Sequence, residues 1–520
     1  MFSAADVVQA VSYSPSTGHD LPVMELPLPA DFAWGTATAA YQIEGGASQD
    51  GKGPSIWDTY SHLEPSRTNG DNADVSCDHY NRMPEDVELM TSLDVDVYRF
   101  SISWSRVIPL GGRDDPVNEK GIAFYNDLID RLLARNIQPV VTLYHWDAPQ
   151  GIYDRYGAFL NTDEFRADFE RYARLCFTRF GDRVKKWVTF NEPYISSIFA
   201  YLNGTLAPGH RREAGTDTKT EPWRVGHTII LSHASAVQIY AQEFQESQQG
   251  DISIVLNGHF YEPFDATSPA DIDAAERRMV FYIGWFADPV FLGTDYPAEM
   301  RSYLGSRLPE FTPEERELLR RTAPINAFYG MNHYSTKYAR ALPEPPADDD
   351  WTGNIEESAV NSEGKEIGPM SGLAWLRVAP SGFQKLLGWV WARYHVPIIV
   401  TENGCPGVGE DDVARAVDDT FRQRYIGLYL DAISRAIYED GVVVQGYYVW
   451  SLMDNYGSCF HGAPLFPVST VMLTGLFLEW SAGYGPRYGI VHVDFETLKR
   501  TPKNSAYYLR DTMKSRRKAT

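Results

Sequence analysis

The sequence predicts an α/β fold, namely a closed (β/α)8 barrel in a single domain. Eight short runs of β-branched and aromatic residues recur along the chain, amphipathic helical stretches separate most of them, and polar residues follow the ends of the runs. The competing fold is an open, doubly wound sheet. Against it, no Gly-x-Gly-x-x-Gly turn follows the first run, and 520 residues are many for one such domain. These observations favour the barrel.

The eight runs are the expected strands. Each is short and largely apolar, as strands covered on both faces by helices and neighbouring strands should be. They extend over residues 31–44, 97–104, 137–146, 187–192, 252–260, 328–334, 398–402 and 443–450.

The stretches between the runs carry helix signals. Residues 84–93 open with a proline and acidic residues, which are typical of the first helical turn. Residues 165–180 place a set of apolar side chains on one helical face, namely Phe169, Tyr172, Ala173, Cys176 and Phe180. We therefore expect helices over both ranges.

Several segments are expected to lie outside the regular barrel. Residues 1–28 contain three scattered prolines, Pro15, Pro22 and Pro27, and Pro29 follows directly; we interpret the range as a poorly ordered leader before a catalytic domain at 29–510. Residues 511–520 form a basic tail, interpreted as solvated. Residues 342–372 are acidic and contain glycine and proline, which is typical of a mobile loop at the rim of a site.

Charge and cysteine content narrow the class of partner. The chain has 69 acidic and 47 basic side chains, a net charge of -22, which disfavours nucleic acid and anionic membranes. We therefore expect a small-molecule partner. The four cysteines and the histidines show no metal-type spacing, so neither a metal nor a cofactor is expected. The first basic residue is Lys52, so we see no secretory signal and expect a cytoplasmic protein.

Two of the runs end in a glutamate. Residues 185–193 read KKWVTFNEP, and the strand should stop at Glu192 because Pro193 cannot donate to a sheet ladder. Residues 397–404 read PIIVTENG and place Glu402 in the same way. A single glutamate at a strand end is more often a solvated loop residue or a helix cap. Two in matching contexts on one barrel face suggest paired-carboxylate chemistry.

Six segments resemble, in the right order, the signatures of family 1 glycoside hydrolases, the β-glucosidase family, in its fungal intracellular type. They are FAWGTATAAYQIEG at 32–45, YRFSISWSR at 98–106, HWD at 145–147, TFNEP at 189–193, TENG at 401–404 and WSLMDN at 450–455. The resemblance covers nearly the whole chain. It implies a TIM barrel and a retaining glycosidase.

The resemblance also implies roles for the two acids. Glu192 would be the acid/base and Glu402 the nucleophile, with the carboxyl groups about 5 Å apart. Two ionised carboxylates at that distance repel by roughly 3 kcal/mol, or about 2 pK units, so one of them should hold its proton. Arg99 and the Tyr334 hydroxyl would favour the charged form of Glu402. Glu192, without such a cation, would stay protonated.

The remaining implied positions surround the sugar. Gln42, His145, Asn191 and Glu479 would bind ring hydroxyls, and Trp450 and Trp480 would offer flat apolar faces. Trp146 and Asn332 would orient the catalytic groups. Taken singly, His145 and Trp450 would more often be core residues and Arg99 could pair with Asp96; their place in the series favours the site.

One departure from the family pattern is large. Residues 457–478 separate Tyr456 from Glu479, where the family continues directly, and this stretch contains no Asp, Glu, Lys or Arg. Its prolines and glycines do not suit a transmembrane helix. We interpret it as a translated, unspliced intron. The alternative is a hydrophobic flap over the aglycone site.

The expected function is hydrolysis of terminal β-D-glucosyl residues from β-glucosides and short oligosaccharides such as cellobiose. The alternative is a weak or inactive sugar-binding relative in which the 457–478 insert displaces Glu479 and Trp480. A 6-phosphosugar specificity is disfavoured because Glu479 would repel phosphate. A plant-type thioglucosidase is disfavoured because it would have glutamine in place of Glu192. Oligomeric state does not follow from the sequence.

Overall fold

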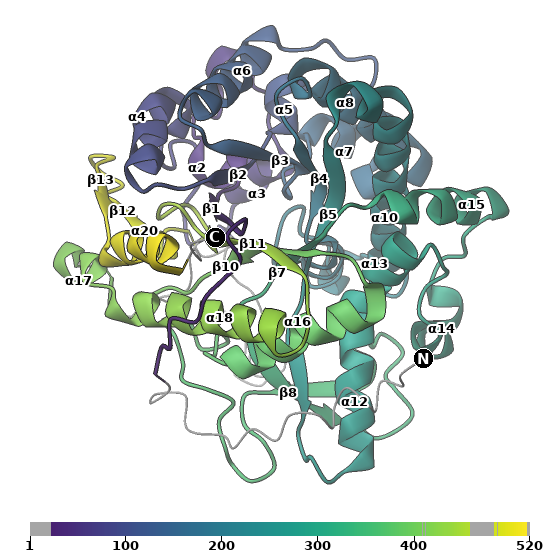
Figure 1. Cartoon of the computed structure of the whole chain (residues 1–520). Helices are drawn as coiled ribbons and strands as arrows, with labels where there is room; N and C mark the ends of the chain where they lie inside the picture. The colour runs from purple at the N-terminus through teal and green to yellow at the C-terminus, as the bar shows by residue number, and fades with distance from the viewer. Residues whose placement is uncertain (1–21, 408, 411, 458–482, 486, 517–520) are drawn as a thin grey trace.

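Eight parallel strands close into a barrel in the computed structural model, which describes residues 22–407, 409–410, 412–457, 483–485 and 487–516 (Figure 1). The order around the barrel is β1-β11-β10-β7-β5-β4-β3-β2. The strand bounds are β1 Ala33–Ala37, β2 Val97–Ser101, β3 Gln138–Tyr144, β4 Lys186–Asn191, β5 Asp251–Asn257, β7 Tyr329–Asn332, β10 Ile398–Asn403 and β11 Val444–Trp450. Each of the eight predicted runs overlaps one of these strands, and the strands close into a barrel, so the barrel prediction is confirmed.

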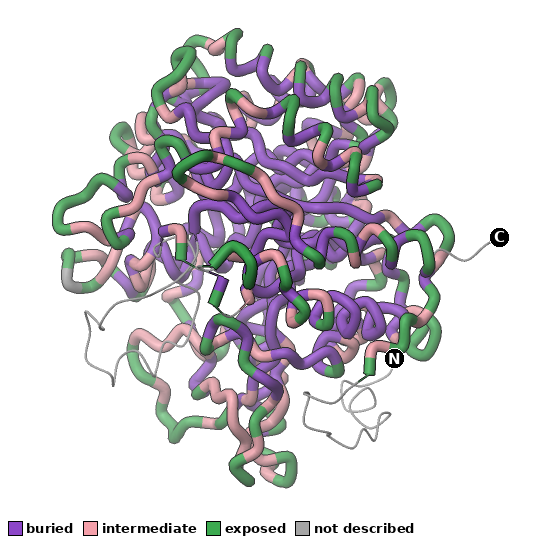
Figure 2. Tube along the Cα trace, turned by 90° about the vertical axis from the view of Figure 1, so that its left-hand side faces the viewer, coloured by how far each residue is buried: buried purple, intermediate pink, exposed green. Residues whose placement is uncertain are grey.

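Helices surround the barrel on its outer side (Figure 1). The long ones are α4 His79–Ser92, α6 Glu119–Ala134, α8 Thr162–Phe180, α10 Glu221–Ile239, α12 Pro269–Met279, α15 Pro313–Thr322, α16 Pro380–Tyr394, α18 Thr420–Tyr438 and α20 Asn504–Arg516. Shorter ones include α2 Ala40–Ile43, α3 Ile56–Ser61, α5 Trp104–Val107, α7 Gln150–Tyr156, α9 Pro193–Ile195, α14 Ala298–Leu304 and α17 Val413–Val417. Figure 2 shows buried residues through the centre of the molecule and exposed residues on outer helices and loops.

The two predicted helices exist with earlier starts. Helix α4 begins at His79, so Pro84 lies inside the helix and does not open it. The early start is held by His79 Nδ1, which lies 2.8 Å from the carboxylate of Asp86, about two helical turns further along. Helix α8 begins at Thr162, three residues before the predicted start, because the Asn161 side chain accepts a hydrogen bond from Glu164 N–H and caps it.

The first run was predicted as one strand over residues 31–44, and this is wrong beyond Ala37. The chain turns after β1, and helix α2 carries Gln42. The turn is held where the Ala40 N–H donates to Ser101 Oγ at 2.7 Å, a contact with the end of β2. A short apolar run does not distinguish a buried strand from a buried helix, and here a neighbouring strand decides.

The loop at residues 342–372 is more ordered than predicted. It contains β9 Ile355–Ser358, which pairs antiparallel with β8 Thr336–Ala341, and β8 in turn pairs with β6 Phe260–Pro263. This three-stranded sheet extends from the barrel beside α12. The acidic and glycine-rich composition reflects turns between these strands, and the interpretation of the whole range as a mobile loop is wrong.

Parts of the predicted leader and tail are integrated into the fold. Leu28 is fully buried, and its N–H donates to the Arg516 carbonyl at 3.2 Å. Helix α20 continues to Arg516, whose guanidinium is buried and lies 2.8 Å from the Asp431 carboxylate. Residues 22–28 and 511–516 therefore stabilise each other, and Arg516 does not belong to a solvated tail. Residues 1–21 and 517–520 lie outside the described part of the chain.

A second small sheet joins β12 Val491–Val493 to β13 Arg500–Pro502 near α20. No helix in the described part of the chain combines the length and the apolar content that crossing a membrane requires.

Candidate active site

The two glutamates lie at the carboxyl ends of β4 and β10, which β5 and β7 separate in the barrel, and both are 3% exposed. Glu402 is the second-last residue of strand β10. It is the register partner of Asn332 on β7, directly after an irregularity in the pairing of the two strands. Glu192 follows β4 and adopts a left-handed backbone conformation, with φ at 49°, before helix α9 begins at Pro193. Ladder irregularities and left-handed backbone at these ends turn the side chains toward the barrel axis.

Glu402 is held by a cation and a phenol. Arg99 donates to Oε1 at 2.5 Å, and the Tyr334 hydroxyl donates to Oε2 at 2.7 Å. Burial raises the pKa of the Glu402 carboxyl above its ordinary value, and Arg99, Tyr334 and Asn332 act in the opposite direction. Both contacts expected for Glu402 are present. Both favour the charged form as expected, while burial opposes them, and the net shift of the Glu402 pKa is upward.

A single amide contacts both acids. Asn332 Nδ2 donates to Glu192 Oε1 at 2.6 Å, and the Asn332 side chain also lies close enough to Glu402 to lower the pKa of that carboxyl. The amide orientation is fixed, because Thr401 Oγ1 donates to Asn332 Oδ1 at 2.8 Å. Two carboxyl groups within reach of one amide face a common space.

Asn191 connects Arg99 and Asn332, which contact the two glutamates, to His145. Its Oδ1 accepts hydrogen bonds from Arg99 at 2.6 Å and from Asn332 at 3.1 Å. Its Nδ2 therefore faces His145 Nε2, 3.1 Å away. Burial, with a smaller effect of Arg99, holds the pKa of His145 well below its usual value, so His145 is neutral.

The other predicted contact residues that the structure describes lie in the same region. Gln42 Nε2 donates to Asn455 Oδ1 and to the Tyr456 carbonyl, while its buried Oε1 has no hydrogen-bond partner among the residues that the structure describes. Trp146 has φ at 71°, and its indole N–H donates to the Asn191 carbonyl at 3.0 Å. The Trp450 ring stacks on His145, with ring centres 5.9 Å apart. An amide acceptor and an indole face thus point where polar hydroxyls and an apolar sugar face could bind.

Glu479 and Trp480 lie outside the described residues, as do residues 458–478 of the proposed insert. The chain on either side of the gap is held together. The Gly457 N–H donates to the Gly483 carbonyl at 2.8 Å, and the Tyr484 N–H donates to the Asp71 carboxylate at 3.1 Å. The barrel therefore presents two adjacent attachment points for residues 458–482.

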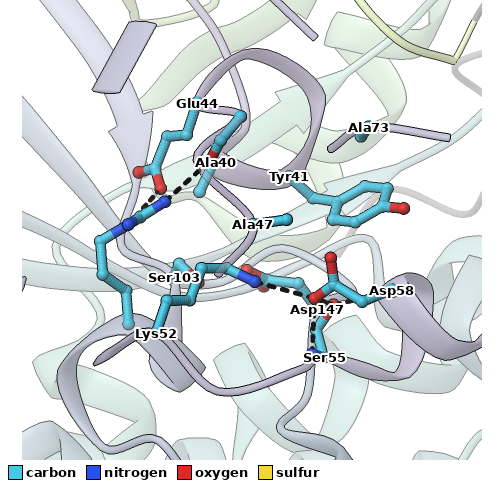
Figure 3. Close-up of a pocket in the computed structure, with 12 residues that line it drawn as sticks. Ala40, Tyr41, Glu44, Ala47, Lys52, Ser55, Asp58, Ala73, Ser103 and Asp147 are labelled. Carbon is cyan, nitrogen blue, oxygen red and sulfur yellow. Dashed lines mark hydrogen bonds and ion pairs between the residues drawn. The ribbon is translucent and has the colours of Figure 1, made fainter. Parts of the chain in front are cut away.

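A small cavity lies between α2, α3, α5 and the segment that follows β3 (Figure 3). Asp147 lines it and is 1% exposed, and no side chain of the described residues donates a hydrogen bond to its two carboxyl oxygens. Burial raises the pKa of Asp147 to about 8. Glu44 also lines the cavity; it pairs with Arg106 at 2.8 Å and accepts a hydrogen bond from the Tyr125 hydroxyl at 2.5 Å.

Asp147 is the buried titratable group that the sequence reasoning missed. It lies inside the HWD motif that was noted for His145 and Trp146, so the motif itself was the available signal. Within the described residues, no group of three or more histidine, cysteine or acidic side chains could hold a metal ion.

Comparison with known proteins places the chain among enzymes of one family. The sequence model of the family described as "Glycosyl hydrolase family 1" matches residues 24–462 and 471–518. It leaves residues 463–470, which lie within the proposed insert, unmatched. Beta-glucosidase 1B from Phanerodontia chrysosporium is 46% identical over 488 residues, which span 93% of this chain and 85% of that protein.

Solved structures agree in fold over nearly the full length. A β-glucosidase from the fungus Humicola insolens in complex with glucose superposes with a TM-score of 0.88 at 44% identity, covering 95% of this chain and 100% of that one. β-Glucosidase 2 from Trichoderma reesei in complex with Tris gives a TM-score of 0.87 at 46% identity, with the same coverage of both chains. Barrel order, ordered motifs and these matches together show that the chain belongs to glycosyl hydrolase family 1.

Proposed function

We propose that this protein is a retaining β-glycosidase that hydrolyses terminal β-D-glucosyl residues from β-glucosides and short oligosaccharides such as cellobiose. The observation that carries the proposal is the shared contact of Asn332 with Glu192 and Glu402, combined with Arg99 and Tyr334 on Glu402 alone. Two acids that face one space in different environments can take different roles. The β-glucosidases to which the chain is similar support the substrate class.

In the first step, Glu402 attacks the anomeric carbon as its bond to the leaving oxygen breaks, and Glu192 gives its proton to that oxygen. In the second step, Glu192 takes a proton from water, the water oxygen bonds to the anomeric carbon, and Glu402 is released as a carboxylate. Arg99 and the Tyr334 hydroxyl stabilise the ionised Glu402 that begins and ends the cycle. Two inversions at the same carbon retain the β configuration.

The other residues bind the sugar. The unpartnered Gln42 Oε1 is suited to accept from a ring hydroxyl, and the neutral His145 and the amide of Asn191 offer further polar contacts. Trp450 provides an apolar face. We include Glu479 and Trp480 in this set on the family pattern alone, because they lie outside the described residues. Trp146 positions Asn191 through its indole hydrogen bond.

The assignment of the two acids is tested by azide rescue on an activated aryl β-glucoside. We expect Glu402→Ala and Glu192→Ala each to lose at least about 1,000-fold in turnover. Azide should then give an α-glucosyl azide with Glu402→Ala, because it attacks the face left open, and a β-glucosyl azide with Glu192→Ala, because it attacks the covalent intermediate. Opposite products would reverse the two roles, and full activity in either variant would refute the proposal.

A matched control separates catalysis from folding. Glu410 is also a buried glutamate, paired with Arg422 at 2.6 Å and with Lys503 at 2.7 Å, away from the acids of the site. Glu410→Gln should lower stability while its turnover, corrected for folded protein, stays within a few-fold of the parent.

We further propose that residues 457–478 are a translated, unspliced intron and that their presence lowers turnover by displacing Glu479 and Trp480, the extreme alternative being a weak or inactive sugar-binding protein. The uncharged composition of the stretch and the unmatched residues 463–470 support this. The Gly457–Gly483 hydrogen bond supports it as well, because the two flanks lie close enough for a much shorter connection to join them. Peptide mapping of the protein from its natural source tests the origin: a peptide spanning residues 472–478 would refute it. Deleting residues 457–478 from the recombinant chain should raise turnover, and unchanged turnover would refute the effect on activity.

A further inference from the structure

A buried cluster of charges lies behind Glu192, between α12 and the three-stranded sheet. Glu357 on β9 accepts from Lys337 on β8 at 2.7 Å and from Arg278 on α12 at 2.8 Å. Arg278 is fully buried, Lys337 is 6% exposed, and the Glu357 side chain is 12% exposed. The two cations and one anion leave the cluster with a net charge of about +1, far from bulk solvent.

The cluster reaches Glu192 through two stacked tyrosines. Arg278 donates to the Tyr194 hydroxyl at 2.9 Å, and Tyr194 is two residues after Glu192, in helix α9. Tyr282 stacks on Tyr194 with ring centres 3.9 Å apart, and the Arg278 guanidinium carbon lies 5.0 Å from the Tyr282 ring centre. Burial raises the pKa of the Tyr282 phenol, with the charge of Glu192 adding to the rise and that of Arg278 opposing it. Tyr282 therefore lies in the field of both groups.

The neighbouring groups compensate the positive charge only in part, because Asp350, the acid outside the cluster that also acts on Tyr194, is partly exposed to solvent. One terminal guanidinium nitrogen of Arg278, Nη1, has no hydrogen-bond partner in the described part of the chain. Burial holds the pKa of His259 well below its usual value, so this histidine is neutral. The Asp350 carboxylate, which also acts on Tyr194, accepts hydrogen bonds from the Gly353 and Asn354 N–H groups. The rings of Tyr194, Tyr261, Tyr282 and Trp351 surround the guanidinium at 5.0 to 5.6 Å and exclude water.

We propose that the Arg278–Glu357–Lys337 cluster stabilises the carboxylate form of Glu192 through Tyr194 and Tyr282, so that Arg278 and Lys337 are positioning residues for the acid/base. This inference rests on the proposed function. Repulsion from Glu402 favours the protonated form of Glu192, which the first step needs. The buried positive charge limits that effect and keeps the carboxylate available as the base of the second step. From the sequence, no cation was expected to act on Glu192.

The test is the alkaline limb of the pH profile of kcat/KM, which reports loss of the Glu192 proton. Removing a positive charge should move the limb to higher pH in Arg278→Met and Lys337→Met. Removing the negative charge should move it to lower pH in Glu357→Gln. For a single charge at roughly two side-chain lengths, each shift should be on the order of one pH unit or less. Arg278→Lys keeps the charge and should leave the limb in place.

A matched control is Arg393→Met. Arg393 also pairs with an acid, Asp288, at 2.6 Å and lies over the rings of Trp389 and Tyr394, on helix α16. It should lower stability without moving the limb. Where Arg278→Met does not fold, the opposite shifts of Lys337→Met and Glu357→Gln decide the matter.

Shifts of equal sign in Lys337→Met and Glu357→Gln, or no shift in either, would overturn the inference. The proposed function fails independently, because the configuration of the azide products identifies Glu192 and Glu402 whatever the pH profile of the cluster variants.

Discussion

The hydroxyl of Tyr334 should set where the protein loses activity on the acid side. Tyr334→Phe removes one hydrogen bond, 2.7 Å long, to Glu402 Oε2 and keeps the ring, which packs edge-on against Trp375 and Tyr488. A buried hydrogen bond to a charged group contributes about 1.5–3 kcal/mol, which corresponds to about 1–2 pK units. Arg99 still contacts Oε1, so the lower end of this range is the better expectation.

The sign of the effect follows from the charge of the nucleophile. The hydroxyl favours the carboxylate, so its loss raises the pKa of Glu402 further above its ordinary value, in the same direction as burial. Glu402 must be ionised to attack, and the acidic limb of kcat/KM should therefore move to higher pH by about one unit. Activity at pH values below the acidic limb should therefore fall about tenfold more than activity on the plateau above it.

The assay is a pH series of kcat/KM with an aryl β-glucoside. Tyr172→Phe is the matched control, because the Tyr172 hydroxyl is fully buried and donates to the Leu143 carbonyl at 2.8 Å, without contact to either acid. The control should lose stability and keep the position of its acidic limb. An acidic limb that stays in place in Tyr334→Phe would show that the phenol does not tune Glu402 and would refute the reasoning.

Two further predictions concern stability. Asp147 is protonated in the fold up to a pKa of about 8, whereas it ionises near its ordinary value of 3.8 in the unfolded chain, so its contribution to stability falls as pH rises between these values. Asp147→Asn should therefore gain stability relative to the parent between pH 5 and pH 8, by at most about 1.4 kcal/mol per pH unit; urea unfolding at both pH values measures this, and an equal difference at the two would contradict it. Arg516→Ala should destabilise by about 3–5 kcal/mol, because it leaves the Asp431 carboxylate buried without its cation; a melting temperature equal to that of the parent would show that the terminal contact contributes little.

The parts of the site that lie close together in sequence could be predicted from the residues alone. A strand ending in Glu192 before a proline, and another ending in Glu402 before Asn403 and Gly404, are local patterns. Parallel strands of a closed barrel end on one face, so two such glutamates meet whatever the intervening loops do. The eight runs were also identifiable from local sequence, because each strand is covered on both faces and is therefore largely apolar.

Contacts between distant segments were decided only by the tertiary structure. The end of β1 depended on Ser101, a residue of the next strand, and the net pKa shift of Glu402 depended on how deeply it is buried. The order within residues 342–372 and the charge cluster on Arg278 both require β9 to pair with β8, far from either acid in sequence. Residue type and spacing determine which groups a strand end carries, whereas burial and partner charges, which set what those groups do, arise only when the chain has closed on itself.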